Sequence, residues 1–143
     1  MRPGPAGLLR QEREVIRNMA KSTHYRWADI QPEAMNSLVN RQYLTGVKTM
    51  LARIELKKGA HVPMHQHFHE QISHTLEGAL KFVLEEGEVI VRGGDILCIP
   101  PNAPHEVFSL EDSVALDIFN PPRQDWIDGD DAYLRGAPEE PAK

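Results

Sequence analysis

The chain has 143 residues and a formal net charge of -5, from 16 basic and 21 acidic residues, and this length is close to that of one domain. No basic run is interleaved with aromatic residues, so nucleic acid is not an expected partner. The longest apolar stretches are strand-sized and the N-terminus lacks the apolar centre of a signal peptide. We therefore expect a cytoplasmic protein with no membrane partner.

Residues 1–22 differ from the rest of the chain and are interpreted as an N-terminal extension, either helical or flexible. They begin with proline and glycine and continue through a charged stretch. A partial apolar stripe at helical spacing is formed by Leu8, Leu9, Val15, Ile16 and Met19. Such a stripe is more often a packing surface than a functional one, so we assign it no chemistry.

Short β-rich runs separated by glycine-containing turns make up the middle of the chain. The predicted strands are residues 47–56, 61–67, 71–76, 80–85, 88–92, 95–99, 105–110 and 114–119. Many short strands without intervening helices predict an all-β antiparallel sandwich or barrel. We place this single domain at residues 23–126 and expect residues 127–143 to form an irregular C-terminal tail.

Cys98 is the single cysteine of the chain, which excludes an internal disulfide. Its neighbours Ile96, Leu97 and Ile99 predict a buried thiol that fills the core. We expect no chemistry from it, because reactive thiols lie in exposed, polar surroundings.

The histidine-rich run from Gly59 to Gln71, followed later by His105, is the most informative part of the chain. His65 and His67 are two residues apart, and strand side chains at this spacing share one face. Gln71 and His105 could then complete one site. Neutral imidazole nitrogens suit transition metals such as zinc, iron, nickel and copper. The pattern predicts a metal centre inside a β-barrel.

Other histidines and the two tryptophans are interpreted as supporting residues. We expect His61, His69 and His74 to support the ligands, line the mouth of the site or lie at the surface, rather than to bind the metal. Trp27 and Trp126 flank the domain and are expected to pack the termini or a dimer contact.

The two histidine motifs resemble those of cupins, which are double-stranded β-helix proteins of the jelly-roll class. The first cupin motif is matched in spacing by Gly59, His65, His67, Gln71 and Gly78. The second is matched by Gly94, Pro100, Asn102, His105 and Ser109. Gln71 replaces the family's Glu, Asn102 its Gly and Ser109 its Asn. Asn tolerates the left-handed backbone almost as well as Gly, whereas the glutamine replaces an anionic ligand with a neutral one.

Residues 27–126 resemble more closely the small single-domain cupins of pectin degradation. Members of that family open the ring of 4,5-unsaturated galacturonate to give linear 5-keto-4-deoxyuronate. The resemblance implies one divalent transition metal, which is zinc, nickel, iron or manganese, held by His65, His67, Gln71 and His105. It also implies an Asp-x-Phe-x-x-x-Arg catalytic pattern at Asp117, Phe119 and Arg123. A homodimer is implied as well.

The chemistry of these side chains suits the implied roles. A divalent ion with an open position can polarise a substrate oxygen. Arg123 could hold a substrate carboxylate or, alternatively, form a surface salt bridge. Asp117 and Phe119 share a strand face by the two-residue period. We expect Asp117 to carry the proton, with a bond to neighbouring backbone as the alternative, and Phe119 to line the sugar site or to pack in the core.

Three classes of function are consistent with the sequence. The first, which we favour, is a redox-neutral lyase or isomerase acting on a small acidic molecule, namely a sugar acid. The second is an iron-dependent cupin dioxygenase, which metal identity and oxygen consumption would distinguish. The third is a non-enzymatic sensor of a small ligand. A sensor would need a separate partner, because no helix-turn-helix segment is present.

Overall fold

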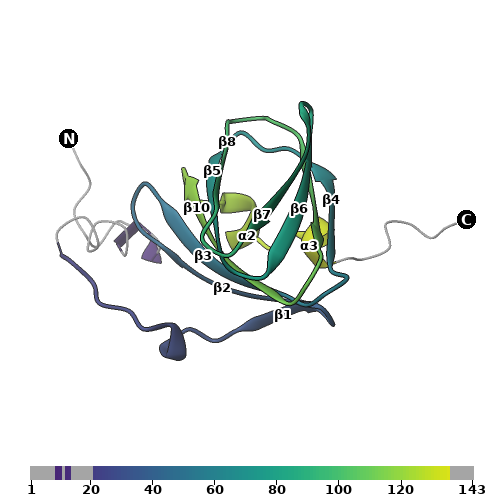
Figure 1. The fold of residues 1–143 in the computed structure, drawn as a ribbon. Helices are drawn as coiled ribbons and strands as arrows, with labels where there is room; N and C mark the ends of the chain where they lie inside the picture. Colours follow the sequence, from purple (N-terminus) through teal and green to yellow (C-terminus); the bar gives the residue numbers. More distant parts are fainter. Residues whose placement is uncertain (1–8, 11, 14–20, 136–143) are drawn as a thin grey trace, which may run out of the picture.

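The computed structural model describes residues 9–10, 12–13 and 21–135, and the proposed apolar stripe of the N-terminal extension lies mostly outside them. Two antiparallel sheets face each other (Figure 1), one with strand order β1-β2-β3-β10-β5-β8 and the other with order β4-β9-β6-β7. The strands are β1 (Glu33–Asn36), β2 (Val39–Thr45), β3 (Met50–Leu56), β4 (His61–His65), β5 (Glu70–Glu77), β6 (Ala79–Leu84), β7 (Gly87–Arg92), β8 (Ile96–Ile99), β9 (His105–Ser109) and β10 (Ser113–Asn120). The predicted all-β antiparallel fold is confirmed.

The eight predicted strands correspond to β3 through β10, whereas β1 and β2 were not predicted. The second of these, Val39–Thr45, carries three consecutive polar residues, which hide its alternation. Arg41 points inward there and is only 2% exposed. Its charge is balanced by ion pairs to Glu33 at 2.8 Å and Asp131 at 2.9 Å. A buried inward arginine gives no strand signal in an apolar pattern.

The core lies between the two sheets and follows from strict alternation on the long strands. Along β3 the inward residues Met50, Ala52, Ile54 and Leu56 are buried. Phe119 of β10 pairs with Met50 and is 1% exposed. Full burial of such side chains contributes roughly 1.5–3 kcal/mol each, so this inner layer holds the sheets in a fixed register.

Two turn positions carry the backbone conformations expected from the motifs. Asn102, which replaces the family's glycine, has φ of 65°, a left-handed conformation that asparagine tolerates. Gly78 has φ of 91°, and a Cβ atom there would collide with Ser113 and the backbone of Asp112. The turn at residue 102 therefore accepts a side chain, whereas the turn at residue 78 requires glycine.

Cys98 is exposed, so the prediction of a buried thiol was wrong. It lies on β8, an edge strand of the six-stranded sheet. Alternation there turns Ile99 inward and leaves Ile96 and Cys98 outward. An apolar run of four residues does not reveal which face is covered.

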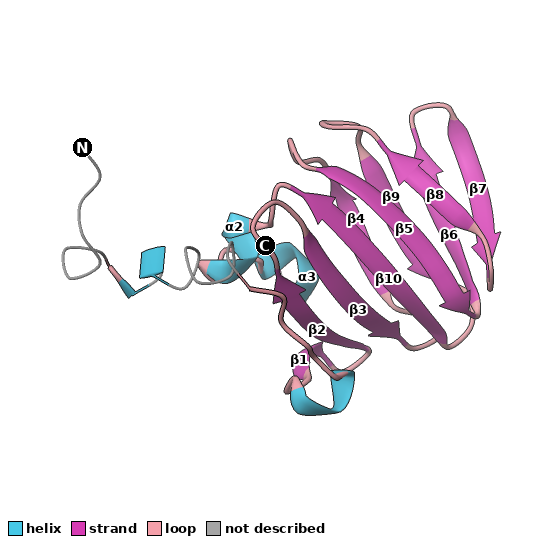
Figure 2. Ribbon diagram, turned by 90° about the vertical axis from the view of Figure 1, so that its left-hand side faces the viewer, coloured by secondary structure: helices cyan, strands magenta, loops and turns pink. Residues whose placement is uncertain are grey.

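The segment after β10 is more ordered than the irregular tail that we predicted, up to the last described residue. It forms helices α2 (Gln124–Ile127) and α3 (Ala132–Arg135). Figure 2 shows both beside one end of the sandwich, and α3 contacts β1 of one sheet and β4 of the other. A short 3-10 helix, η2 (Trp27–Asp29), precedes β1. None of the helices in the described part is long and apolar enough to cross a membrane.

Candidate metal centre

Three of the predicted ligands come together inside the barrel. One nitrogen from each of His65, His67 and His105 lies within 4.8 Å of the others. His65, at the end of β4, pairs directly with His105, at the start of β9. Strand β4 ends at His65, so the prediction that His67 shares its strand was wrong. His67 reaches the cluster from the loop before β5, and its ring centroid lies 5.1 Å from that of His105.

All three imidazoles are held by main-chain carbonyls at the nitrogen that faces away from the cluster. Nδ1 lies 2.7 Å from the Pro63 oxygen for His65, 3.1 Å from the His69 oxygen for His67 and 2.9 Å from the Ala103 oxygen for His105. A carbonyl can only accept, so each Nδ1 carries the hydrogen. The neutral rings therefore leave their Nε2 lone pairs free, which is the arrangement that orients metal-bound histidines.

Gln71 brings a fourth acceptor to the same point. Its Oε1 lies 3.2 Å from Nε2 of His67. Its side-chain amide group donates a hydrogen bond to the Asp117 carboxyl group, which leaves the amide oxygen to face the histidines. Two acceptors at this separation are favourable when a cation lies between them. His105 Nε2 is also buried without a hydrogen-bond partner among the described residues. The four residues thus fit a metal ion.

Burial keeps these histidines neutral at physiological pH. It lowers the pKa of His65 to about 4 and that of His67 to about 3, and it lowers the pKa of His105 as well. The neighbouring positive charge of Arg123 contributes to the lowering of all three pKa values. Because the ligating form of histidine is the neutral one, the cluster is ready to bind a metal without releasing protons.

The metal-free protein is expected to lose stability as the pH falls from about 6.5 to about 5. Unfolded histidines take up protons in this window, whereas folded His65, His67 and His105 with lowered pKa values do not. The unfolded state then binds more protons than the folded state, so the free energy of unfolding decreases as the pH is lowered. Asp117 has the opposite effect, because its pKa is raised to about 6 in the folded state. It is one group, whereas three histidines act in the other direction. Thermal denaturation across the window checks this, and an unchanged or higher midpoint at the lower pH would contradict it.

A cavity opens beside the ligands and contains two of the predicted catalytic residues on one strand. Asp117 and Phe119 of β10 both line it, as do His65, Gln71 and His105. The expectation that the aspartate and the phenylalanine share a face is confirmed. Phe119 also packs in the core, which is one of the two alternatives expected for it.

Asp117 is the carboxyl group that lines this cavity. It pairs with Ser73 of β5 across the sheet. Burial raises its pKa to about 6, although polar hydrogens of Ser73 and Gln71 and the charge of Arg123 act against the rise. Its Oδ1 is buried without a hydrogen-bond partner in the described part of the chain. A carboxyl group that can gain or lose a proton near neutral pH suits general acid-base work.

Arg123 lines the cavity but is not a free clamp. It is 2% exposed, so its expected surface location was wrong, although it does form a salt bridge, with Asp125. Its Nε and Nη2 donate to the two oxygens of Asp125 at 3.0 and 2.7 Å, and Nη2 also donates to the Tyr133 hydroxyl at 2.7 Å. The guanidinium lies 4.9 Å from the Phe119 ring and 4.7 Å from the Trp126 ring. These contacts commit three of its five N–H groups.

The C-terminal helices contribute to the cavity, which the sequence did not predict. Trp126, Tyr133 and Leu134 line the cavity, whereas Trp126 was expected only to pack a terminus or a dimer. A four-residue helix is too short for periodicity to reveal. Among the additional histidines, His69 supports the site through its backbone oxygen, which holds His67. His61 is exposed on the outer surface and pairs with Glu106.

Comparisons with known proteins agree with this architecture. Residues 52–119 match the family model described as "Cupin domain". An uncharacterized protein of Methanocaldococcus jannaschii is 31% identical over 77 residues, which are 53% of this chain and 62% of that protein. The chain thus matches less than two thirds of the length of that relative.

Two solved structures are similar over most of their length. KdgF from Halomonas sp. has a TM-score of 0.70 and 25% identity, with 74% of this chain and 99% of that chain covered. An RmlC-like cupin from Shewanella frigidimarina has a TM-score of 0.68 and 26% identity, with 73% and 96% covered. Together with the two matched motifs, these similarities show that residues 52–119 form a cupin domain and that the chain has the cupin jelly-roll fold.

Proposed function

We propose that the protein is a metal-dependent cupin enzyme that acts on a small sugar acid and opens the ring of 4,5-unsaturated galacturonate. Its metal is held by His65, His67, Gln71 and His105. The observation that carries the proposal is the position of Asp117, a carboxyl group with its pKa raised to about 6, in the same cavity as these side chains. The reaction is redox-neutral and requires a proton carrier at this place.

Three further findings support the assignment to sugar acids. The Asp-x-Phe-x-x-x-Arg pattern resembles that of the small cupins of pectin degradation. The similarity to KdgF covers nearly the whole of that chain and supports the same assignment to the cupins of pectin degradation. The cavity is also lined by Arg123, whose positive charge favours an anionic substrate.

The ring opening is an isomerisation in which protons move between two positions. The C1 hydroxyl loses a proton, the bond between C1 and the ring oxygen breaks, and C4 gains a proton as the enol at C5 becomes a ketone. A bound divalent metal supplies Lewis-acid polarisation of a substrate oxygen. Asp117 takes the first proton and delivers a proton to C4, which is general acid-base catalysis. Phe119 forms an apolar wall for the sugar ring.

Arg123 acts on the substrate differently from the free carboxylate fork that the sequence suggested. Three of its N–H groups are engaged by Asp125 and Tyr133. Its fixed position between two aromatic rings keeps a positive charge at the cavity wall. Asp125 balances part of this charge, and the remainder acts on an anion because little water screens it in a buried site.

Turnover of 4,5-unsaturated galacturonate tests the proposal. Metal-loaded protein is expected to accelerate the loss of ultraviolet absorbance from the conjugated double bond, and chelation of the metal should abolish the acceleration. The variant His61→Ala, altered at an exposed histidine away from the cavity, serves as the control and should behave like the wild type. Absence of acceleration by protein with metal bound would contradict the proposed reaction.

The same samples separate the other two functions. An iron-dependent dioxygenase would consume oxygen with its substrate, and a sensor would bind a sugar acid without turnover. The homodimer also remains a proposal. Ile96 and Ile118, on the outer face of the six-stranded sheet, are exposed apolar side chains that a second copy could cover.

A further inference from the structure

Tyr133 stands out among the cavity residues to which no role has been given. It lies on α3, outside the β-barrel strands, and reaches into the cavity beside the metal cluster. Its ring centroid is 4.7 Å from that of His65. A side chain this close to a ligand can touch whatever the metal site holds.

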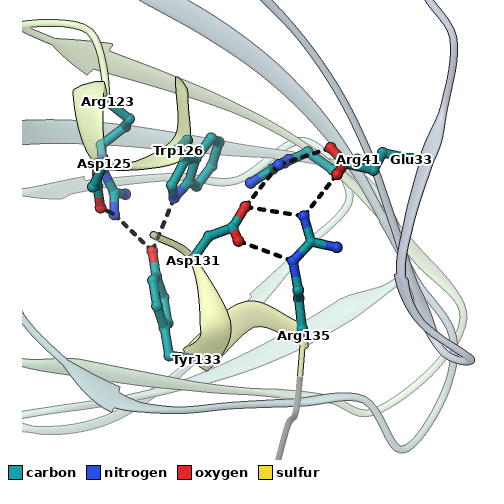
Figure 3. Close-up of polar contacts among 8 residues, drawn as sticks. All are labelled: Glu33, Arg41, Arg123, Asp125, Trp126, Asp131, Tyr133 and Arg135. Carbon is teal, nitrogen blue, oxygen red and sulfur yellow. Dashed lines mark hydrogen bonds and ion pairs between the residues drawn. The ribbon is translucent and has the colours of Figure 1, made fainter. Parts of the chain in front are cut away.

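The Tyr133 hydroxyl accepts two hydrogen bonds. Nη2 of Arg123 donates to it at 2.7 Å, and Nε1 of Trp126 donates to it at 3.1 Å. Both bonds are drawn in Figure 3. A phenol oxygen accepts with its lone pairs and donates with its one hydrogen. Because arginine and the indole N–H can only donate, the remaining capacity of this oxygen is donation alone.

The hydroxyl hydrogen has no protein acceptor among the hydrogen bonds of the described residues. A donor that lines a cavity without a partner is satisfied by a ligand or by water. The adjacent positive charge of Arg123 makes the hydroxyl a stronger donor, because hydrogen bonds in a network polarise one another. An oxygen carrying negative charge is the acceptor that this arrangement favours.

We propose that Tyr133 is a substrate-contacting residue that donates a hydrogen bond to a negatively charged oxygen of the sugar acid in the cavity. The inference rests on the proposed function for the position and class of the ligand. It assigns to α3 a part of the binding site that the ligand and catalytic motifs do not contain. The site would thus select acids through a neutral donor as well as through the charge of Arg123.

The position of Tyr133 is fixed by an ion-pair network around the buried Asp131, two residues earlier in the chain. Asp131 is 1% exposed and pairs with Arg41 of β2 at 2.9 Å and with Arg135 at 2.9 Å. Arg135 and Arg41 both reach Glu33 of β1. Figure 3 shows this network next to the contacts of Tyr133. The helix is therefore held to the first two strands, which keeps the hydroxyl at the cavity.

Binding of saturated galacturonate, which does not undergo the reaction, tests the proposal without reference to turnover. Calorimetric titration of the Co²⁺-loaded protein gives the affinity, and the visible spectrum of Co²⁺ reports whether the metal site is unchanged. Tyr133→Phe should weaken binding about tenfold, the usual effect of one lost hydrogen bond to a charged group. Tyr43→Phe is the matched control, because Tyr43 packs on the same Trp126 but does not line the cavity.

A second variant separates donation from packing. Tyr133→3-fluorotyrosine keeps the ring and the hydroxyl but makes its hydrogen a stronger donor, so galacturonate should bind more tightly than to the wild type at slightly acidic pH. Equal affinity in wild type and Tyr133→Phe, no gain with the fluorinated residue, or no binding by the wild type would overturn the inference. Failure of the proposed function is seen separately, as absence of turnover by protein that still binds galacturonate.

Discussion

Replacement of His105 by alanine is expected to lower metal affinity by roughly 100-fold or more, since even residues that only support metal ligands change affinity by 10–100-fold. His105 is 1% exposed, and its Nε2 is buried without a partner among the described residues. Its Nδ1 is held by the Ala103 carbonyl, so the ring is oriented before any metal binds. Equilibrium dialysis with Zn²⁺ or Ni²⁺ measures the loss.

The control for this change is His61→Ala. His61 stacks on Phe108, and its side chain is 43% exposed, so its removal should leave affinity and stoichiometry unchanged. Circular dichroism of metal-free His105→Ala establishes that the barrel has folded. Full metal binding by folded His105→Ala would show that the ion binds elsewhere and that the cluster is not the metal centre.

Replacement of Asp117 by asparagine is expected to lower kcat by roughly 10² to 10⁴, which is the usual contribution of a general acid-base group. Metal content should not change, because the ligand Gln71 and the three histidines remain. The change keeps the size of the side chain but removes proton transfer. Steady-state kinetics with 4,5-unsaturated galacturonate, together with metal analysis of the same samples, measures both quantities.

The pH dependence of the wild type provides a second test of Asp117. Its pKa is raised to about 6, so the ionised form that accepts a proton is lost below this pH, and the rate should fall there. The variant Asp112→Asn, changed at an exposed turn residue, should keep the wild-type rate and profile. Wild-type kcat in metal-loaded Asp117→Asn would remove Asp117 from the mechanism.

The features that depend on periodicity and spacing could be predicted from the sequence. Alternation along residues such as Met50–Leu56 specifies an inward face without knowledge of the partner strand. The two histidine motifs predicted a cluster that the pairing of His65 with His105 forms in the structure. Asp117 and Phe119 lie on one face because the strand period requires it.

The remaining features depend on tertiary contacts that no local pattern encodes. An inward-facing arginine is tolerated on β2 because its charge is balanced by Asp131, 90 residues later in the chain. The polar sequence of β2 therefore hides a strand that only this distant contact explains. Tyr133 reaches the cavity because ion pairs hold a four-residue helix against β1 and β2. Cys98 is exposed because alternation on β8 turns it to the outer face of the sheet. The packing of the other sheet, and not the apolar run itself, decides which face is covered.

The most direct test of the metal centre is a titration of the metal-free protein with Co²⁺, followed by X-ray absorption at the metal edge. We predict one ion per chain, bound by imidazole nitrogens at about 2.0–2.1 Å with oxygen completing the set, and loss of the imidazole signal in His105→Ala. Absence of tight binding, or a bound ion surrounded by oxygen atoms alone, would contradict a site made by His65, His67, Gln71 and His105.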